Sequence, residues 1–154
     1  MPMQPIGIDL PDEAATIALA EAVAPLLRRG DVVTLSGLIG AGKTTFARAL
    51  IRSLAGDQAL EVPSPTFTLV QPYDGTRIPV AHFDLYRLAE GTELDELGFD
   101  DAVADGIALV EWPERAPGRF PDGLVVALSP AGGGRRAVLS GGPAWLRRLA
   151  QLGL

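Results

Sequence analysis

The sequence contains no cysteine, one histidine and one lysine among its 154 residues. The absence of cysteine excludes disulfides, zinc sites built from thiolates and cysteine nucleophiles. The lone histidine, His82, likewise excludes a metal cluster rich in histidine. Arginine supplies the other twelve basic residues, so Lys43 marks a position where a compact ammonium is needed rather than any positive charge.

Long apolar runs and strongly basic stretches are also absent. Residues 1–16 are acidic and lack the basic region and apolar run of a signal peptide. The longest apolar patches are interrupted at Glu21 or Pro25, so they are too short to cross a bilayer. The formal net charge of −6 argues against nucleic-acid binding as the main task, although Arg135–Arg136 and Arg147–Arg148 are basic pairs, more typical of a solvated face than of a patch. We expect a cytoplasmic protein without membrane contact.

Apolar strands alternate with helical patterns along the chain, which predicts an α/β fold. Helices are expected from about Glu13 to Gly30, from the glycine-rich stretch to Gly56, and over residues 93–104 and 143–152. Single strands are expected at 31–37 and 106–112, and hairpins at 66–73 with 77–86 and at 123–130 with 135–141. Together these elements predict one three-layer α/β/α domain over residues 1–154, whose mixed sheet has a parallel core and antiparallel hairpins at its edges.

A phosphate-binding loop follows the first predicted strand. Gly37, Gly42, Lys43 and Thr44 fit the P-loop pattern G-x-x-x-x-G-K-[ST], which occurs here between a strand and a helix. Glycines let successive amide groups converge on a phosphate, and the helix that follows adds the positive end of its dipole. Lysine reaches the β- and γ-phosphates, and threonine provides a hydroxyl for Mg²⁺. The expected nucleotide-binding residues of the loop are Gly40, Ala41, Gly42, Lys43, Thr44 and Thr45.

A P-loop also needs a carboxylate on the magnesium side, at the end of a neighbouring apolar strand. Glu111 ends one such strand and Asp84 lies near the end of another. Either carboxylate could hold Mg²⁺ or orient the attacking water, and Glu111 is favoured because its strand is the more apolar. The alternative is an ordinary sheet-edge carboxylate that pairs with an arginine. The nearby aromatic side chains are expected to be packing residues, namely His82, Tyr86 and Trp112.

Two large classes of P-loop protein can be excluded. Guanine-specific GTPases need a second lysine in an N-K-x-D segment, and Lys43 is the only lysine. Residues 139–143 imitate the signature of ABC ATPases, but they follow Glu111 instead of preceding it. Small-molecule kinases remain an alternative, although the segments between the predicted strands leave no obvious acceptor-binding domain.

Four segments carry a more specific resemblance. GAGKTT (40–45), SPTFTLV (64–70), HFDLYRL (82–88) and LVEWPER (109–115) occur in the order and spacing of the bacterial TsaE family. The chain therefore resembles the ATPase component of tRNA threonylcarbamoyladenosine (t⁶A) biosynthesis, over nearly its whole length.

The resemblance implies a role for each matching residue. Lys43 and Thr44 match the phosphate and magnesium positions, Glu111 a second magnesium-side residue, and Asp84 an acid important for ATP hydrolysis. Ser64, Pro65 and Thr66 match a switch-like loop near the γ-phosphate, with Thr66 as a nucleotide contact, while Glu13 and Gly134 match positions near the adenosine. Leu38 departs from the family, which often has an acidic residue there.

The resemblance also implies a function. We expect a Mg²⁺-dependent ATPase of low turnover that supports the TsaD and TsaB proteins, which transfer a threonylcarbamoyl group to adenosine 37 of tRNA. ATP and Mg²⁺ are the expected cofactors, and contact with tRNA is expected to be indirect. The alternatives from other classes are a phosphotransferase acting on a small metabolite and a nucleotide-gated binding module without turnover.

Overall fold

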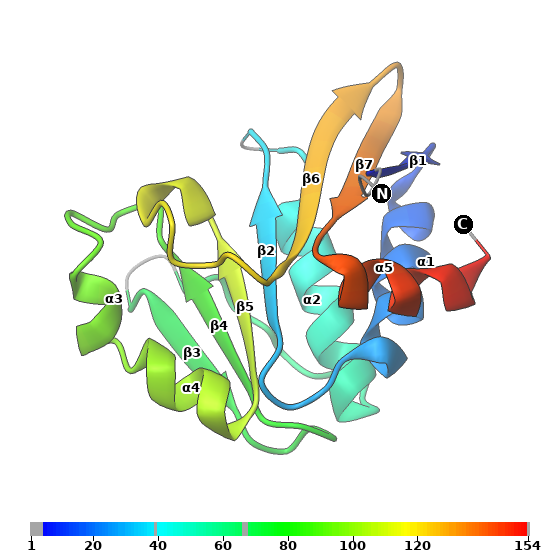
Figure 1. The fold of residues 1–154 in the computed structure, drawn as a ribbon. Coiled ribbons are helices and arrows are strands. Elements are labelled where there is room, and N and C mark those ends of the chain that lie inside the picture. Colours follow the sequence, from blue (N-terminus) through cyan, green and yellow to red (C-terminus); the bar gives the residue numbers. More distant parts are fainter. Residues whose placement is uncertain (1–4, 39, 66–67, 154) are drawn as a thin grey trace.

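A seven-stranded mixed sheet forms the centre of the computed structural model, which describes residues 5–38, 40–65 and 68–153 (Figure 1). The strand order is β1-β7-β6-β2-β5-β4-β3. The four central strands are parallel: β2 (Val32–Ser36), β4 (Val80–Asp84), β5 (Ile107–Glu111) and β6 (Leu124–Ala131). The outer strands pair antiparallel: β1 (Ile6–Leu10), β3 (Val70–Tyr73) and β7 (Gly134–Ser140). This confirms the predicted parallel core with antiparallel edge hairpins.

Helices lie on both faces of this sheet (Figure 1). The α-helices are α1 (Glu13–Val23), α2 (Lys43–Ala55), α3 (Glu93–Glu96), α4 (Phe99–Asp105) and α5 (Pro143–Leu149). Short 3₁₀ turns follow α1, β5 and α5 at Ala24–Leu26, Pro113–Arg115 and Ala150–Leu152. Asp12 caps α1 by accepting a hydrogen bond from the amide of Ala15 at 2.9 Å, and Gly56 ends α2 in the left-handed conformation.

Two apolar cores separate the layers, and the alternation of side chains along the strands divides residues between them. On β5, Ile107 and Leu109 belong to the larger core, whereas Ala108 and Val110 belong to the smaller one. The larger core includes buried residues of α1, α2 and α5, and the smaller one includes Phe99 of α4. Because both faces of β4 and β5 are covered, every residue of these two strands is buried.

Several predicted boundaries were wrong for identifiable physical reasons. The first helix stops at Val23 rather than near Gly30, because Pro25 lacks the amide hydrogen that the helix would need and a 3₁₀ turn forms instead. The helix predicted over 93–104 is two helices, separated at Gly98, which has a φ of 80°. Strand β1 was not predicted at all. Its alternating residues Ile6, Ile8 and Leu10 are strand-like, but only pairing with β7 holds so short a segment in the sheet.

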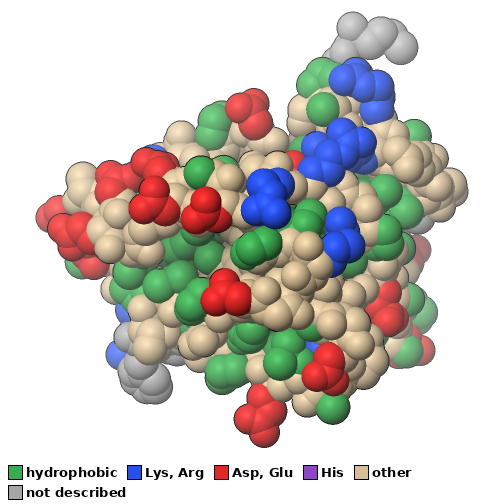
Figure 2. Space-filling model, turned by 90° about the horizontal axis from the view of Figure 1, so that it is seen from below, with side chains coloured by type: hydrophobic (Ala, Val, Ile, Leu, Met, Phe, Trp, Pro, Cys, Tyr) green, Lys and Arg blue, Asp and Glu red, His purple; other side chains and the backbone are tan. Residues whose placement is uncertain are grey.

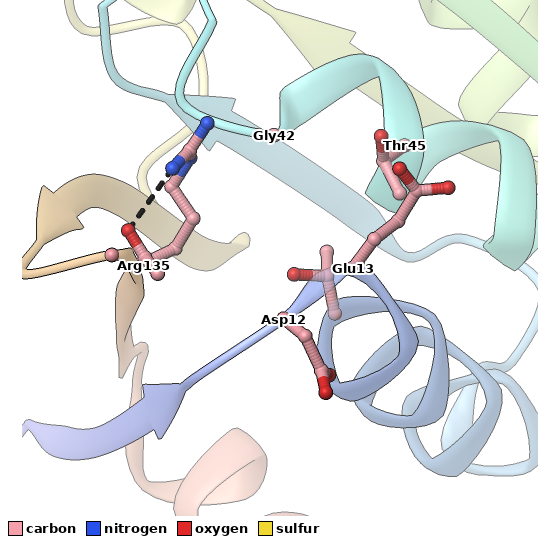
Figure 3. A pocket seen from close by; sticks show the side chains of 8 residues that line it. Asp12, Glu13, Gly42, Thr45 and Arg135 are labelled. Carbon is pink, nitrogen blue, oxygen red and sulfur yellow. Dashed lines mark hydrogen bonds between the residues drawn. The ribbon is translucent and has the colours of Figure 1, made fainter.

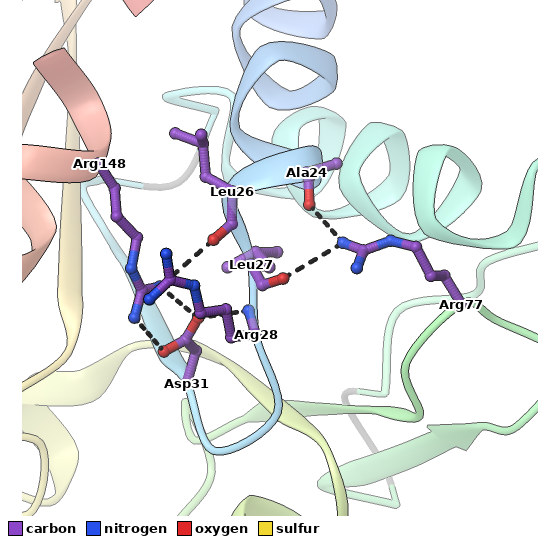
Figure 4. A network of polar contacts seen from close by, with 7 residues as sticks. All are labelled: Ala24, Leu26, Leu27, Arg28, Asp31, Arg77 and Arg148. Atoms are coloured by element: carbon purple, nitrogen blue, oxygen red, sulfur yellow. Dashed lines mark hydrogen bonds and ion pairs between the residues drawn. The ribbon is translucent and has the colours of Figure 1, made fainter. Parts of the chain in front are cut away.

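Two arginine side chains, Arg148 and Arg77, bind the turn between α1 and β2. Arg148 makes a two-pronged ion pair with Asp31 at 2.6 and 3.2 Å, and it also donates to the carbonyl of Leu26 at 3.3 Å (Figure 4). Arg77 donates to the carbonyl oxygens of Ala24 and Leu27 at 2.9 and 3.3 Å. Side chains from distant segments therefore fix the turn that feeds β2, the strand that leads into the P-loop.

Charge is unevenly distributed over the surface. On the face shown in Figure 2, acidic side chains gather over the end of the molecule that carries α3, while several basic side chains lie close together on the other half, where acidic side chains are scattered too. The acidic residues of α3 are Glu93, Asp95 and Glu96. Among the helices formed by residues 5–38, 40–65 and 68–153, none has both the length and the apolar character needed to cross a membrane.

Candidate functional site

The P-loop joins the end of β2 to the start of α2, as the pattern predicts. Gly42 immediately precedes α2 with a φ of 102°, a conformation that favours glycine, and its carbonyl accepts a hydrogen bond from Phe46 at 3.0 Å. The amide of Ala41 donates to the carbonyl of Leu38 at 3.0 Å, which closes the turn. The amide groups at the N-terminus of a 13-residue helix are thus available to an anion.

Lys43 is buried at the base of this loop without a carboxylate partner in the described part of the chain. Its ammonium donates to the carbonyl oxygens of Gly37 and Leu38 at 2.5 and 2.9 Å. Burial lowers the pKa of Lys43, and the nearby negative charges of Glu111, Glu114 and Asp84 partly oppose this change. Two neutral carbonyl groups compensate a positive charge poorly, so an anion that reached the loop would be a better partner.

Trp112 covers the lysine from the other side. The Lys43 nitrogen lies 4.3 Å from the centroid of the indole ring, and the ring of Tyr86 lies 4.9 Å from that of Trp112. Trp112 has a φ of 60°, which is unfavourable for a bulky residue and turns the chain sharply after Glu111. The expectation that Trp112 and Tyr86 are simple packing residues is therefore incomplete, because together they shape the surroundings of the ammonium.

The two strand-end carboxylates lie side by side. Asp84 of β4 is in register with Glu111 of β5, and both side chains are buried. Burial raises the pKa of Asp84 above its usual range. The backbone hydrogen bond from Tyr86, at 3.0 Å to Oδ1, acts in the opposite direction. Two neighbouring carboxylates with little access to water form a negative site that favours a cation.

His82 contacts Glu111 directly. Its Nε2 lies 2.7 Å from Glu111 Oε2, and its other ring nitrogen, Nδ1, is buried without a hydrogen-bond partner among the residues that the structure describes. A lone histidine in an apolar strand gave no sequence signal for this contact, because the β4–β5 register pairs His82 with Leu109 and makes Glu111 its diagonal neighbour, two residues further along β5. His82 therefore fixes the orientation of Glu111 and leaves one carboxylate oxygen for another partner.

The segment that precedes β3 is attached to Asp84. The Ser64 side chain donates a hydrogen bond to the Asp84 carboxylate, and the amide of Asp84 donates to the carbonyl of Leu69 at 2.9 Å. The amide of Leu69 in turn donates to the carbonyl of Pro65 at 2.7 Å. Thr66, the predicted nucleotide contact of this segment, lies outside the described residues.

Two adjoining cavities open at the P-loop. The lysine cavity, of about 270 Å³, lies at the end of β4 and β5 and is lined by Gly40, Gly42, Lys43, Thr44, Thr45, Asp84, Glu111, Trp112 and Arg135. The hairpin cavity, of about 230 Å³, lies between α1, α2 and β7 (Figure 3) and is lined by Asp12, Glu13, Thr16, Gly42, Thr45, Gly133, Gly134 and Arg135. The structure thus brings together most of the predicted site residues. Ala41 lines neither cavity, because its side chain is buried in the larger core.

The donor groups of the lysine cavity suit Mg²⁺. Magnesium binds oxygen ligands, usually one or two carboxylates completed by water and substrate phosphates. Glu111 and Asp84 supply buried carboxylates, and Thr44 supplies a hydroxyl on the same cavity. In the described part of the chain, no three His, Cys, Asp or Glu side chains converge on one point, so a cation would need oxygen atoms from a ligand as well.

Comparisons with known proteins agree with this arrangement. The family model described as "Threonylcarbamoyl adenosine biosynthesis protein TsaE" matches residues 10–137. The tRNA threonylcarbamoyladenosine biosynthesis protein TsaE of Rickettsia felis is 41% identical over 105 residues, which span 68% of this chain and 61% of that protein, less than two thirds of its length. The protein of the same name from Aquifex aeolicus is 41% identical over 106 residues, covering 69% of this chain and 75% of that one.

More distant relatives match over more of the chain. The Bacillus subtilis protein named TsaE is 35% identical over 125 residues, covering 80% of this chain and 77% of that one. The crystal structure of Bacillus subtilis YdiB has a TM-score of 0.83 at 25% identity and covers 99% of this chain and 97% of its own. With the P-loop, the mixed sheet and these matches established, the chain belongs to the TsaE family, which takes part in t⁶A biosynthesis on tRNA, and it has the P-loop NTPase fold.

Proposed function

We propose that this chain is a Mg²⁺-dependent ATP-binding protein with low ATPase turnover, which supports TsaD and TsaB in forming t⁶A at adenosine 37 of tRNA. The observation that carries the proposal is the lysine cavity, where Lys43, Thr44 and two strand-end carboxylates meet at the N-terminus of α2. The names of the relatives support the pathway. The proposed place of action is the cytoplasm, with tRNA contacted only through the partner proteins.

Each residue of the cavity has a proposed task. Lys43 exchanges its two carbonyl partners for phosphate oxygens, and Thr44 and Glu111 hold the metal ion. Mg²⁺ held there would supply neutralisation of the negative charge on the triphosphate. Asp84 faces the same space and orients the water whose oxygen attacks the γ-phosphorus, while the bond to the bridging oxygen breaks and ADP leaves.

The segment attached to Asp84 provides a route from the nucleotide to the partner proteins. Ser64 and Leu69 bind the end of β4, so a γ-phosphate beside Asp84 would change the surroundings of these two residues directly. Reversing a conformational preference of about 1:99 requires about 5.5 kcal/mol of differential binding, which charge-assisted contacts to phosphate and metal can supply. Equal protease sensitivity of this segment with ATP and ADP, and equal partner affinity, would contradict the switch.

Two substitutions test the assignment. Lys43→Ala is expected to abolish ATP binding while the protein stays folded, because it removes the central cation of the site. Glu111→Gln keeps the shape but removes a charge, so it should weaken Mg²⁺ dependence and hydrolysis more than nucleotide binding. Calorimetry and phosphate release measure both effects, and unchanged turnover in Lys43→Ala would refute the site.

The reaction class is tested by incubating the pure chain with ATP. Phosphate released without an acceptor, and faster in the presence of TsaD and TsaB, supports the proposal. ADP formed only when a small-molecule acceptor is present would identify a kinase instead, and ATP that is bound but never cleaved would identify a binding module.

A further inference from the structure

Arg135 lines both cavities of the site, and it has no task in the ATPase reaction proposed above. It lies at the start of β7, where its backbone is in register with Leu10 of β1 and Pro130 of β6. Its side chain leaves the sheet edge and lines both the hairpin cavity and the lysine cavity (Figure 3). The P-loop that it reaches is 95 residues earlier in the chain.

Among the described residues, the hydrogen-bond partners of the guanidinium are neutral carbonyl groups. Its Nε and one terminal nitrogen donate to the carbonyl of Gly40 at 3.1 and 2.7 Å, and the other terminal nitrogen donates to the carbonyl of Gly134 at 3.0 Å. Within the described residues, Arg135 forms no ion pair. The neighbouring Arg136 differs, since it pairs with Asp9 at 2.7 Å on the exposed side of the hairpin.

An arginine beside a P-loop that forms no ion pair with a carboxylate is available to bind an anion. Guanidinium is always charged and presents several donors in a plane, which matches the geometry of phosphate oxygens. Lys43 and Arg135 carry unpaired positive charges on the two sides of the loop, and the nucleotide's phosphate chain is the anion long enough to contact both.

We propose that the Arg135 guanidinium binds the phosphates shared by ADP and ATP, at the junction of the two cavities. This inference rests on the proposed function, because it requires that the site bind a nucleotide. Arg135 lines both cavities, and the hairpin cavity is the one that neither Asp84 nor Glu111 lines, so the guanidinium marks the side of the site away from the two carboxylates. The γ-phosphate would lie beside those carboxylates. Arg135 is therefore assigned to the other end of the triphosphate, that is, to the α- and β-phosphates.

The test compares Arg135→Gln with Arg136→Gln in the intact chain. Both variants remove one positive charge from adjacent positions of β7, but only Arg135 faces the cavities. Titration calorimetry with Mg·ADP and Mg·ATP is expected to show affinity for both nucleotides reduced about ten- to a hundredfold in Arg135→Gln, the usual effect of losing a hydrogen bond to a charged group. Arg136→Gln should stay within about twofold of the unmodified chain, and Arg135→Lys should recover part of the loss because it keeps the charge.

A contact to the phosphates must also change their spectrum. The ³¹P resonance of the α-phosphate of bound ADP should move in Arg135→Lys and remain in place in Arg136→Gln, which a purely structural tether of Gly40 would not require. Unchanged ADP affinity in Arg135→Gln, or a loss confined to ATP, would overturn the inference while leaving the proposed function intact. An unmodified chain that binds neither nucleotide would overturn both.

Discussion

Burying a polar atom without a hydrogen-bond partner lowers the stability of a fold, and Tyr73 is an example with no evident functional reason. The hydroxyl of Tyr73, on the edge strand β3, is buried without a hydrogen-bond partner in the described part of the chain. Burial raises the pKa of this hydroxyl, and the charge of Arg48 only partly offsets the effect. Tyr73 lines neither cavity of the site and, unlike His82, it does not contact Glu111, so burying its hydroxyl serves no evident chemical purpose.

Replacing Tyr73 by phenylalanine should therefore stabilise the protein. The variant keeps the ring in the larger core and removes an unsatisfied hydroxyl, so we expect the free energy of unfolding to rise by about 1 kcal/mol. Urea denaturation at neutral pH measures the change. The matched control is Tyr86→Phe, because Tyr86 is 41% exposed and its variant should stay within about 0.5 kcal/mol of the original. A less stable Tyr73→Phe would show that the hydroxyl has a partner after all.

Asp84 also lowers the stability of the fold, because its carboxylate is buried, but this carboxylate belongs to the proposed site. Its raised pKa means that folding disfavours the ionised carboxylate, so a destabilising contribution is present above the folded-state pKa. This contribution disappears as the pH falls through that pKa toward the ordinary value of 3.8. The free protein is thus less stable at neutral pH than it would be with a neutral side chain at this position.

Asp84→Asn should stabilise the protein at pH 7, by about 0.5–2 kcal/mol, as is usual when an active-site group is neutralised. The asparagine oxygen can still accept the hydrogen bond from the Tyr86 amide. Paired urea titrations without Mg²⁺ at pH 7 and near pH 4 should show the advantage of the variant shrinking in acid. An advantage that grew as the pH fell would contradict the sign, and phosphate release should be lower in the variant.

Some residues around the candidate site could be predicted from the sequence, and others could not. Lys43 and Thr44 were found because a contiguous motif fixes their geometry, and Asp84 and Glu111 because strands that end at one sheet edge bring their last residues together. His82 and Arg135 were missed, since their contacts depend on strand register and on a reach across 95 residues. No local pattern encodes either contact.

At the scale of elements, the close approach of β1 and β7 decides the width of the hairpin cavity. Gly134 begins β7 where the chain leaving β1 crosses it, and a Cβ atom at this position would lie 2.7 Å from the carbonyl oxygen of Pro11. Local patterns did predict a hairpin here, but they could not predict β1, whose five residues depend on β7 for their hydrogen bonds. The β1–β7 pairing, next to which Glu13 and Gly134 line the same cavity, is therefore a tertiary property.

Replacing each of two adjacent glycines of this hairpin by alanine distinguishes the effect of a close contact from the effect of backbone flexibility. Gly134→Ala should push the β1–α1 connection away from β7, lowering the free energy of unfolding by about 1–3 kcal/mol and weakening nucleotide binding. Gly133→Ala is the control, because its Cβ would meet no atom within 4 Å. Thermal unfolding and ADP titration check both variants, and equal effects would show that backbone freedom matters rather than the close contact.

At the scale of the whole molecule, the proposed nucleotide site adds a further link between the centre of the sheet and its β1–β7 side, which the hydrogen bonds from Arg135 to Gly40 already connect. The P-loop belongs to the central strand β2, whereas the hairpin cavity adds the N-terminus of α1 and the start of β7 from the far edge. A nucleotide that fills both cavities would contact the P-loop at the centre of the sheet as well as the starts of α1 and β7. Binding free energy then suppresses the local opening of all the elements it touches.

Hydrogen exchange should reveal this linkage. With ADP and Mg²⁺ at about 100 times the dissociation constant, binding contributes about 2.7 kcal/mol, so amides that exchange only through openings that release the nucleotide should slow about a hundredfold. We expect slower exchange over residues 36–46, at the β1–α1 connection and at the β6–β7 turn, with β3 unchanged because it lies at the opposite edge of the sheet. Protection confined to residues 36–46 would mean that the ligand occupies the lysine cavity alone, and the edge hairpin would then have no part in binding.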